Sequence, residues 1–303
     1  MTADTAIAFS VIVPTRDRPA ALGRCLESLA NLDYPRDLFE VLVVDDGGTL
    51  SPQASVDAIR ERVRVRVIAR AHAGPAAARN AGAAEAAHPV LAFIDDDCRA
   101  DRAWLTALAR ALAEDPGRMV GGRIVNALTR NPFADASQTL IAYLYDYFNR
   151  DGPRFFCSNN LAADRATFLA VGGFDASFPF AAGEDRDLCD RWHFARHAMC
   201  YAPDALVYHS HDLDLRGFWR QHLRYGRAAA HYHELFASRR GREVAVEPPH
   251  FYVNLVRWPF NAGMPPARAL ACAGLLVVSQ IANAGGFVYE RYRRGRERSG
   301  VSA

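Results

Sequence analysis

The chain has 303 residues, half of them hydrophobic, and a formal net charge of +2. This composition can bury a sizeable core, as one large domain or one domain with an appendage, and it argues against a largely disordered chain. All 36 strongly basic residues are arginine, yet the near-neutral net charge argues against a general nucleic-acid binder, which normally carries a strongly basic face, so no nucleic-acid partner is expected.

Short apolar runs rich in β-branched residues alternate with segments of helical period in the first third of the chain. The runs cover 8–13, 40–44, 63–69 and 90–94. Helices are expected after the first run, where Asp17 can cap the helix, from about Pro75, and over 101–115. This alternation predicts crossover units and a mainly parallel sheet flanked by helices.

The pattern changes at about residue 126. An aromatic stretch precedes "SNNLAADRATFLAVGGFD", in which Asp164 is expected to cap a short helix that ends at Gly172 and Gly173. The segment "AAGEDRDLCDRWHFAR" predicts a polar turn leading into a helix, and "ALVYHSHD" predicts a strand. A helix rich in arginine and aromatic residues then leads into a linker, "SRRGREVAVEPPH".

The C-terminal part contains twenty uncharged residues, 269–288, bracketed by Arg268 and "RYRRGRER". This segment either spans or lies against a membrane, with contact through 257–298, or packs as a helix or an oligomer contact. The N-terminus lacks the features of a signal peptide, and the six cysteines form no CxxC pair. We therefore expect free thiols and a cytoplasmic location, either free or at the inner face of the cell membrane.

Four polar motifs follow the predicted strands, where a parallel sheet places its ligand crevice. Asp95 and Asp97 in "DDD" can offer oxygens to a divalent cation that holds a nucleotide diphosphate, although solvated acids at a strand end are the alternative. Asp45 in "DDGG" can bind a base or ribose, or form a polar turn. Arg79 can reach a phosphate, or form a surface salt bridge. The chain lacks GxGxxG and GK[ST], which disfavours a Rossmann dehydrogenase and a P-loop enzyme.

In order and spacing, "VIVPTRDRP", "VLVVDDGG", "GPAAARNAG", "FIDDDC" and "GEDRDLCDRW" resemble the family 2 glycosyltransferases of the GT-A fold over about residues 8–235. The resemblance implies an α/β GT-A domain over 1–240, with a nucleotide-binding half (1–125), an acceptor-binding half (126–240) and a helical extension (241–303). It further implies inverting transfer of one sugar from a nucleotide-diphosphate sugar, with Mn²⁺ or Mg²⁺, to a hydroxyl of a glycan, lipid-linked or secondary-metabolite acceptor. Bacterial cell-envelope polysaccharide synthesis is the implied setting.

The resemblance assigns the donor side residue by residue. Residues expected to bind the nucleotide sugar are Pro14, Thr15, Asp45, Arg79, Asp95 and Asp96, and Asp97 is the expected metal ligand. A histidine after the late strand would be a further ligand. His209 is favoured over His211, because alternate residues of a strand face opposite ways and only one is expected to point at the site.

The acceptor side contains the expected base. Inversion by in-line displacement needs a base opposite the leaving diphosphate, and Asp185 is that candidate, although a carboxylate can also serve only to cap a helix. Glu184, Trp192, Gln221, Arg224 and Tyr225 are expected to bind the acceptor, the last three resembling a QxxRW motif with tyrosine in place of tryptophan. Since the transmembrane helices of a processive synthase are missing, transfer of one sugar is expected.

Two other functions remain open at this point. A nucleotidyltransferase also places acids and a metal at such strand ends, but normally has a glycine-rich basic loop, whereas "VPTRDRPAALGR" is poor in glycine. The second alternative is a protein that binds a nucleotide sugar but has no activity, and the presence of Asp97 and Asp185 argues against it.

Overall fold

A computed structural model describes residues 7–178, 180–244 and 246–298. Its strands are β1 (Phe9–Thr15), β2 (Phe39–Asp46), β3 (Arg64–Arg70), β4 (Val90–Phe93), β5 (Cys98–Ala100), β6 (Met119–Asn126), β7 (Leu161–Asp164) and β8 (Met199–His209). The four predicted strands correspond to β1 to β4, so the periodicity argument is confirmed for this half.

All described strands form one sheet in the order β3-β2-β1-β4-β7-β6-β8-β5. The half built from β1 to β4 is parallel, with Thr15 opposite Asp45 at the carboxyl ends of β1 and β2. The other half is mixed, because β7 runs antiparallel to β4 and β6, and β5 runs antiparallel to β8. The sheet edge that follows β1, β2 and β4 carries the predicted polar motifs.

The helices are α1 (Pro19–Ala30), α2 (Gln53–Asp57), α3 (Pro75–Glu85), α4 (Trp104–Ala113), α5 (Pro132–Asn149), α6 (Arg165–Ala170), α7 (Glu184–Phe194), α8 (Leu215–Arg240), α9 (Pro249–Asn261) and α10 (Pro266–Arg298), with short 3₁₀ turns at Arg36–Leu38 and Ser158–Asn160. Helices α1, α2 and α4 cover one face of the sheet, where Val11 and Val13 point, while α3, α6 and α7 cover the other, where Ile12 points. Alternate strand residues thus fill two separate cores.

Local capping chemistry agrees with the sequence at α6 but not at α1. Asp164 accepts a hydrogen bond from Thr167 N, as predicted, and Gly172 and Gly173 follow the helix with positive φ. Asp17 does not cap α1: its φ is 55°, and its Oδ1 accepts from the backbone N–H groups of Thr49 and Leu50. The side chain therefore joins two loops at the carboxyl ends of β1 and β2.

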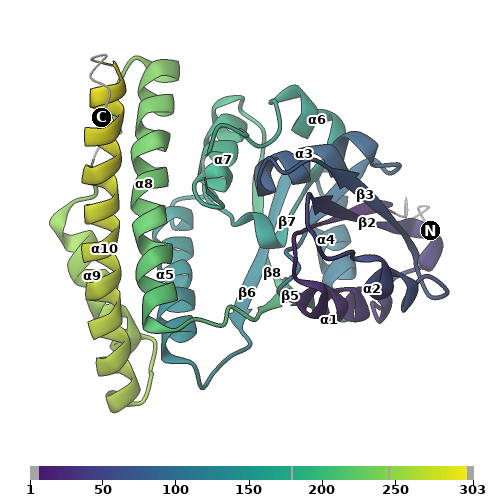
Figure 1. The fold of residues 1–303 in the computed structure, drawn as a ribbon, viewed down its shortest axis with the longest axis horizontal. Coiled ribbons are helices and arrows are strands. Elements are labelled where there is room, and N and C mark those ends of the chain that lie inside the picture. Colours follow the sequence, from purple (N-terminus) through teal and green to yellow (C-terminus); the bar gives the residue numbers. More distant parts are fainter. Residues whose placement is uncertain (1–6, 179, 245, 299–303) are drawn as a thin grey trace.

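The helical extension packs beside α5 and α8 as a layer at one end of the molecule (Figure 1). Leu140 and Tyr143 of α5, Phe218 of α8, Leu255 of α9 and Leu276 of α10 share one hydrophobic cluster. Helices α8 and α10 approach closely, and buried Glu290 of α10 pairs with Arg227 of α8 at 2.8 Å. The extension therefore shares its core with the helices that precede it.

Candidate active site

The three consecutive acids after β4 point to different partners. Each accepts a hydrogen bond from a separate side chain: Asp95 from Arg79 at 2.6 Å, Asp96 from Thr15 at 2.7 Å and Asp97 from Arg18 at 2.9 Å. A turn closed by Cys98 N donating to the carbonyl of Asp95 at 3.0 Å separates the carboxylates. Divergence and arginine neighbours together relieve the repulsion expected of adjacent like charges.

Arg18 is the positive group that sequence reasoning missed. Its guanidinium pairs with both Asp96 and Asp97, while its side chain remains 51% exposed at the cavity. The available signal was the uncompensated "DDD" itself, together with an arginine in the loop after the first strand. An exposed guanidinium beside a cation site is suited to binding phosphate oxygens.

Asp96 is a correction to the prediction that it contacts the nucleotide sugar. Its side chain is fully buried and bonded to Thr15, so it cannot reach a ligand in this arrangement. Burial raises the pKa of Asp96 to about 7, with Asp95 and Asp97 adding repulsion and Arg18 opposing the shift. Thr15 is also buried, and its hydroxyl donates to Asp96, so it helps to hold the turn that contains the three acids.

Asp97 and His209 form the strongest candidate for a cation site. Cys98 of β5 lies opposite His209 of β8, and this register brings His209 Nε2 to 3.4 Å from Asp97 Oδ1. Burial is the largest single effect on Asp97 and opposes its charge, but the hydrogen bond and charge of His209, together with the charges of Arg18 and His211, outweigh burial and lower the pKa of Asp97. Ligand atoms of Asp97, Cys98 and His209 lie within 4.8 Å of one another. Carboxylate and imidazole suit Mn²⁺, whereas burial raises the pKa of the Cys98 thiol, which makes it a poor ligand.

His211 also faces the cavity, contrary to the strand-alternation argument. β8 ends at His209, so the alternation does not continue, and the two imidazole rings lie 5.2 Å apart. Burial lowers the pKa of His211 to about 4, with repulsion from His209 contributing. Only His209 contacts Asp97 among the two.

Arg79 bridges the donor-side acids and the start of α7. Its buried guanidinium contacts Asp95 at 2.6 Å and Glu184 at 3.2 Å. Glu184, predicted to bind acceptor hydroxyls, is buried against Arg79 at the cavity wall, and its Oε2 has no hydrogen-bond partner among the described residues. Burial, and then repulsion from Asp185, raise the pKa of Glu184 to about 7. The single positive charge of Arg79 faces three carboxylates, those of Asp95, Glu184 and Asp185. It cannot neutralise all three, which favours a proton on Glu184.

Asp185 is half-buried in the wall of the cavity at the first turn of α7. The helix begins after Gly183, whose φ of 85° would strain other residues. Asp185 Oδ1 accepts a hydrogen bond from Arg186 N at 2.8 Å. Burial raises the pKa of Asp185, although this hydrogen bond and Arg79 oppose the shift. A carboxylate with a raised pKa at a cavity wall is suited to accepting a proton.

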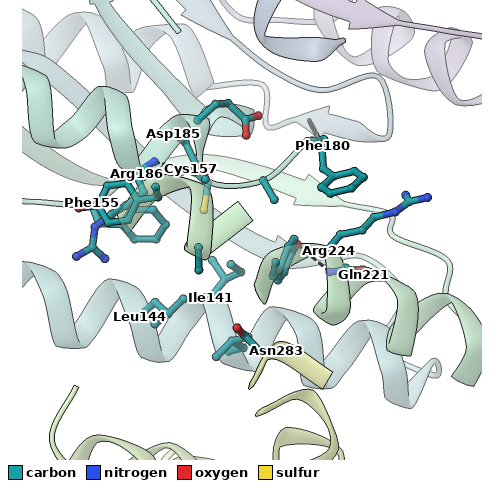
Figure 2. A pocket seen from close by; sticks show the side chains of 18 of the residues that line it. Ile141, Leu144, Phe155, Cys157, Phe180, Asp185, Arg186, Gln221, Arg224 and Asn283 are labelled. Carbon is teal, nitrogen blue, oxygen red and sulfur yellow. Dashed lines mark hydrogen bonds between the residues drawn. The ribbon is translucent and has the colours of Figure 1, made fainter. Parts of the chain in front are cut away.

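One cavity of about 990 Å³ joins the acid cluster to the helical layer. Figure 2 shows Asp185 and Arg186 of α7, Ile141 and Leu144 of α5, Gln221 and Arg224 of α8 and Asn283 of α10 around it. Tyr225 also lines the cavity, and its hydroxyl accepts from Gln221 Nε2 at 2.8 Å. The structure thus brings the three α8 residues of the predicted acceptor site together with Asp185.

The ends of β1 and β2 adjoin the acid cluster through the Thr15–Asp96 hydrogen bond, but the predicted nucleotide-binding residues Pro14, Thr15 and Asp45 do not line the described cavity. Pro14 is buried within β1, and Asp45, half-buried at the end of β2, accepts a hydrogen bond from Gly48 N at 2.9 Å. The neighbouring Asp46 accepts from the backbone N–H groups of Ala73 and Gly74. Asp46 thereby fixes the loop that leads into α3 and Arg79.

Trp192 is a further correction. It is fully buried in the core beside α6 and α7, and its indole N–H donates to the carbonyl of Ala198 at 2.9 Å. The position lies on the inner face of α7, away from the cavity. The aromatic side chain packs the sheet and is not available to stack on a sugar.

The sequence matches the family described as "Glycosyl transferase family 2" over residues 10–170. It is 33% identical over 230 residues to "Pre-mycofactocin glycosyltransferase" of Mycobacterium tuberculosis, covering 73% of this chain and 46% of that protein. It is 30% identical over 215 residues to "Validoxylamine A glucosyltransferase" of Streptomyces hygroscopicus, covering 61% and 51%. The chain thus spans about half the length of these curated relatives.

Solved structures with the same fold are more distant in sequence. A mannosyltransferase of Pyrobaculum calidifontis, in complex with GDP-Man and Mn²⁺, superposes with a TM-score of 0.62 at 18% identity, covering 92% of this chain and 88% of that one. Residues 1–349 of S. aureus TarS, in complex with UDP-GlcNAc, superpose with a TM-score of 0.57 at 18% identity, covering 95% and 92%. The fold is the GT-A fold, and the chain belongs to glycosyl transferase family 2.

Proposed function

We propose that the protein is a metal-dependent, inverting glycosyltransferase that moves one sugar from a nucleotide-diphosphate sugar to an acceptor hydroxyl. One observation carries this proposal: the Asp97–His209 pair and the half-buried Asp185 line the same cavity. A cation-binding pair and a proton acceptor in one cavity are the two parts that in-line displacement of a diphosphate requires.

Asp97 and His209 would hold Mn²⁺ or Mg²⁺. When bound, the metal neutralises charge that develops on the diphosphate. Arg18, now paired with Asp96 and Asp97, is exposed and positioned to bind phosphate oxygens. Arg79 holds Asp95 at the donor side, and Asp45 is proposed to contact the base or ribose. The solved GT-A structures bound to GDP-Man with Mn²⁺ and to UDP-GlcNAc support a nucleotide sugar as donor.

Asp185 is the proposed base. Its carboxylate would accept the proton of the attacking acceptor hydroxyl, and Gln221, Arg224 and Tyr225 would orient the acceptor across the cavity. Arg79 positions α7 through Glu184, so the donor-side acids and the base are held by one side chain. The acceptor is a glycan, lipid-linked or secondary-metabolite hydroxyl compound.

A thermal-shift panel tests the donor site. UDP, GDP and dTDP are added with and without Mn²⁺, and one of them is expected to raise the melting temperature only with the metal, because ligands that bind the native state stabilise it. Asp97→Asn is expected to abolish the metal-dependent shift, while Asp101→Asn, at the turn before α4, retains it. A panel in which no nucleotide diphosphate stabilises the wild type refutes the proposal.

We further propose that α10 lies against the anionic surface of the inner face of the cell membrane. Among the described residues, α10 is the one helix long and apolar enough to cross a bilayer, and 33% of its most apolar stretch is buried. Its inner face is tied to α8 through Glu290, which favours a surface position over spanning. Its outer face exposes Leu270, Val277 and Ile281, and near its end Arg291 lies exposed and Arg296 half-buried.

A further inference from the structure

We propose that the acceptor carries an apolar moiety, and that this moiety lies in the part of the cavity bounded by α5 and α10, which we call the apolar groove. The proposal rests on the proposed function, since it concerns the molecule whose hydroxyl would meet Asp185. It narrows the acceptor class from any hydroxyl compound to an amphiphile.

The composition of the groove walls carries the argument. Helix α5 contributes Ile141, Leu144 and Phe148, and α10 contributes Ala284 and Phe287. Among the described residues, neither helix supplies a charged side chain to the cavity. Figure 2 shows Ile141 and Leu144 across the cavity from Asp185. An acceptor with its hydroxyl at Asp185 that extends toward α5 and α10 therefore meets apolar walls, whereas α8 presents Arg220 and Arg224 to the cavity.

A few polar groups lie where the groove meets the reaction centre. Gln221 donates to Tyr225, but its buried Oε1 has no hydrogen-bond partner among the described residues. Asn283 and Gln280 add amides from α10. Isolated polar groups on an apolar wall orient a ligand without binding many hydroxyls. A long soluble glycan would lose water from its hydroxyls against Ile141 and Leu144 without replacement, which is unfavourable.

Binding of alkyl β-glucosides to the full chain tests the proposal without depending on turnover. The dissociation constants of methyl, butyl, hexyl and octyl glucoside are measured by calorimetry below their micelle concentrations, with and without the nucleotide diphosphate and Mn²⁺. We expect affinity to rise about fourfold for each buried methylene. p-Nitrophenyl glucoside is measured alongside to compare an aromatic moiety with an aliphatic chain. The moiety that contributes more binding free energy per carbon atom is the preferred one.

A pair of α10 variants locates the site. Ala284 is exposed and lines the cavity, so the larger side chain of Ala284→Phe would fill the groove. We expect this variant to weaken the binding of octyl glucoside at least tenfold and to leave the binding of methyl glucoside unchanged. Ala271→Phe, on an exposed position of the same helix outside the cavity, is the matched control and is expected to bind as the wild type does. Melting temperatures of both variants verify that they fold.

The outcomes distinguish this inference from the proposed function. Equal affinity for methyl and octyl glucoside, or no binding by any alkyl or aryl glucoside, overturns the apolar groove, while nucleotide binding with Mn²⁺ leaves the proposed function standing. Chain-length dependence without any nucleotide binding overturns the proposed function instead. An effect of Ala271→Phe equal to that of Ala284→Phe places the apolar contact outside the groove and also overturns the proposal.

Discussion

Asp185 combines partial burial, a place in the cavity wall and a raised pKa. We expect Asp185→Asn to lower kcat by about 10²- to 10⁴-fold, the usual contribution of a general base, with little change in nucleotide affinity. Because burial raises the pKa of Asp185, the acid limb of the wild-type kcat profile is expected above the ordinary aspartate value of about 3.9.

Asp190→Asn is the control, since this residue lies on the same helix, bonds to the Tyr232 hydroxyl and does not line the cavity. The measurement is the rate of product formation at saturating donor over a pH series. Transfer by Asp185→Asn at a rate close to that of the wild type would show that another group takes the proton.

The raised pKa of Glu184 predicts that the free energy of unfolding depends on pH. Its folded-state pKa of about 7 lies above the ordinary value of 4.5, so the folded chain holds a proton that the unfolded chain loses. The resulting stability is complete below about pH 4.5 and is lost as pH rises through 7, by at most about 1.4 kcal/mol per pH unit. Glu184→Gln mimics the protonated state, so its stability relative to the wild type is expected to increase over this window.

Urea unfolding at several pH values between 4.5 and 7.5 measures the difference. Glu85→Gln, whose carboxylate is 60% exposed on α3, is the control for removing a carboxylate outside the acid cluster. A wild-type to Glu184→Gln gap that is constant across the range would mean that Glu184 is already ionised beside Arg79.

Residue types and order were sufficient to predict which side chains gather at the site, but not which of them face it. Asp95, Asp97, Arg79, Asp185 and His209 meet around one cavity, as the motif series predicted. Asp96 and Trp192 are buried away from the cavity, because the direction of a side chain in a turn or on a helix face depends on packing that no local pattern encodes. Arg18 was missed for the same reason, since its partners are about eighty residues away in the sequence.

Strands with a continuous run of β-branched and other apolar residues were predictable, and strands without such a run were not. β1 to β4 match the predicted runs, whereas β5 has three residues, and β7, with four like β4, reads LAAD and contains no β-branched or aromatic residue. β6 has eight residues, but two glycines and Arg123 interrupt its apolar run. These short strands, with β6, make the second half of the sheet mixed, so that β8 can bring His209 beside Asp97. The late strand was predicted near its end, and it is longer than the visible motif.

Helices α8 and α10 meet where glycines permit backbone contact. A Cβ placed on Gly286 would lie 2.1 Å from the Leu223 carbonyl oxygen, whereas one placed on Gly285 would meet nothing within 4 Å. We expect Gly286→Ala to destabilise the protein by about 1–3 kcal/mol through overpacking. Gly285→Ala, the matched control, is expected to stabilise it by up to about 1 kcal/mol through helix propensity.

Chemical unfolding of the two variants gives the comparison directly, because they differ by one position on one helix. Equal effects of the two substitutions would show that α8 and α10 are not in backbone contact. Loss of the helical layer alone, visible as a separate early transition, would show that α9 and α10 unfold independently of the sheet.

At the scale of the whole molecule, the sheet and the helical layer present different surfaces. α10 lies at the outer edge of the layer, on the side away from the sheet (Figure 1). Its outer face combines exposed Val277 and Ile281 with arginines near its C-terminal end, and the apolar groove opens between this helix and α5. A bilayer contacting α10 would therefore lie beside the groove that we propose for an apolar acceptor moiety.

Co-sedimentation with vesicles tests this orientation. The full chain is expected to bind vesicles that contain phosphatidylglycerol and to bind phosphatidylcholine vesicles weakly, since each arginine near an anionic surface contributes about 1 kcal/mol. Binding should weaken as salt is raised from 0.1 to 1 M, where the Debye length falls from about 10 to 3 Å. The double variant Val277→Asp and Ile281→Asp is expected to lower binding at least about tenfold by removing apolar contact and adding repulsion.

Leu169→Asp, at an exposed position on α6 beside the sheet, is the control and is expected to bind vesicles as the wild type does. Wild-type protein that stays in the supernatant with anionic vesicles at low salt would rule out the membrane contact, and equal loss in both variants would place the contact elsewhere.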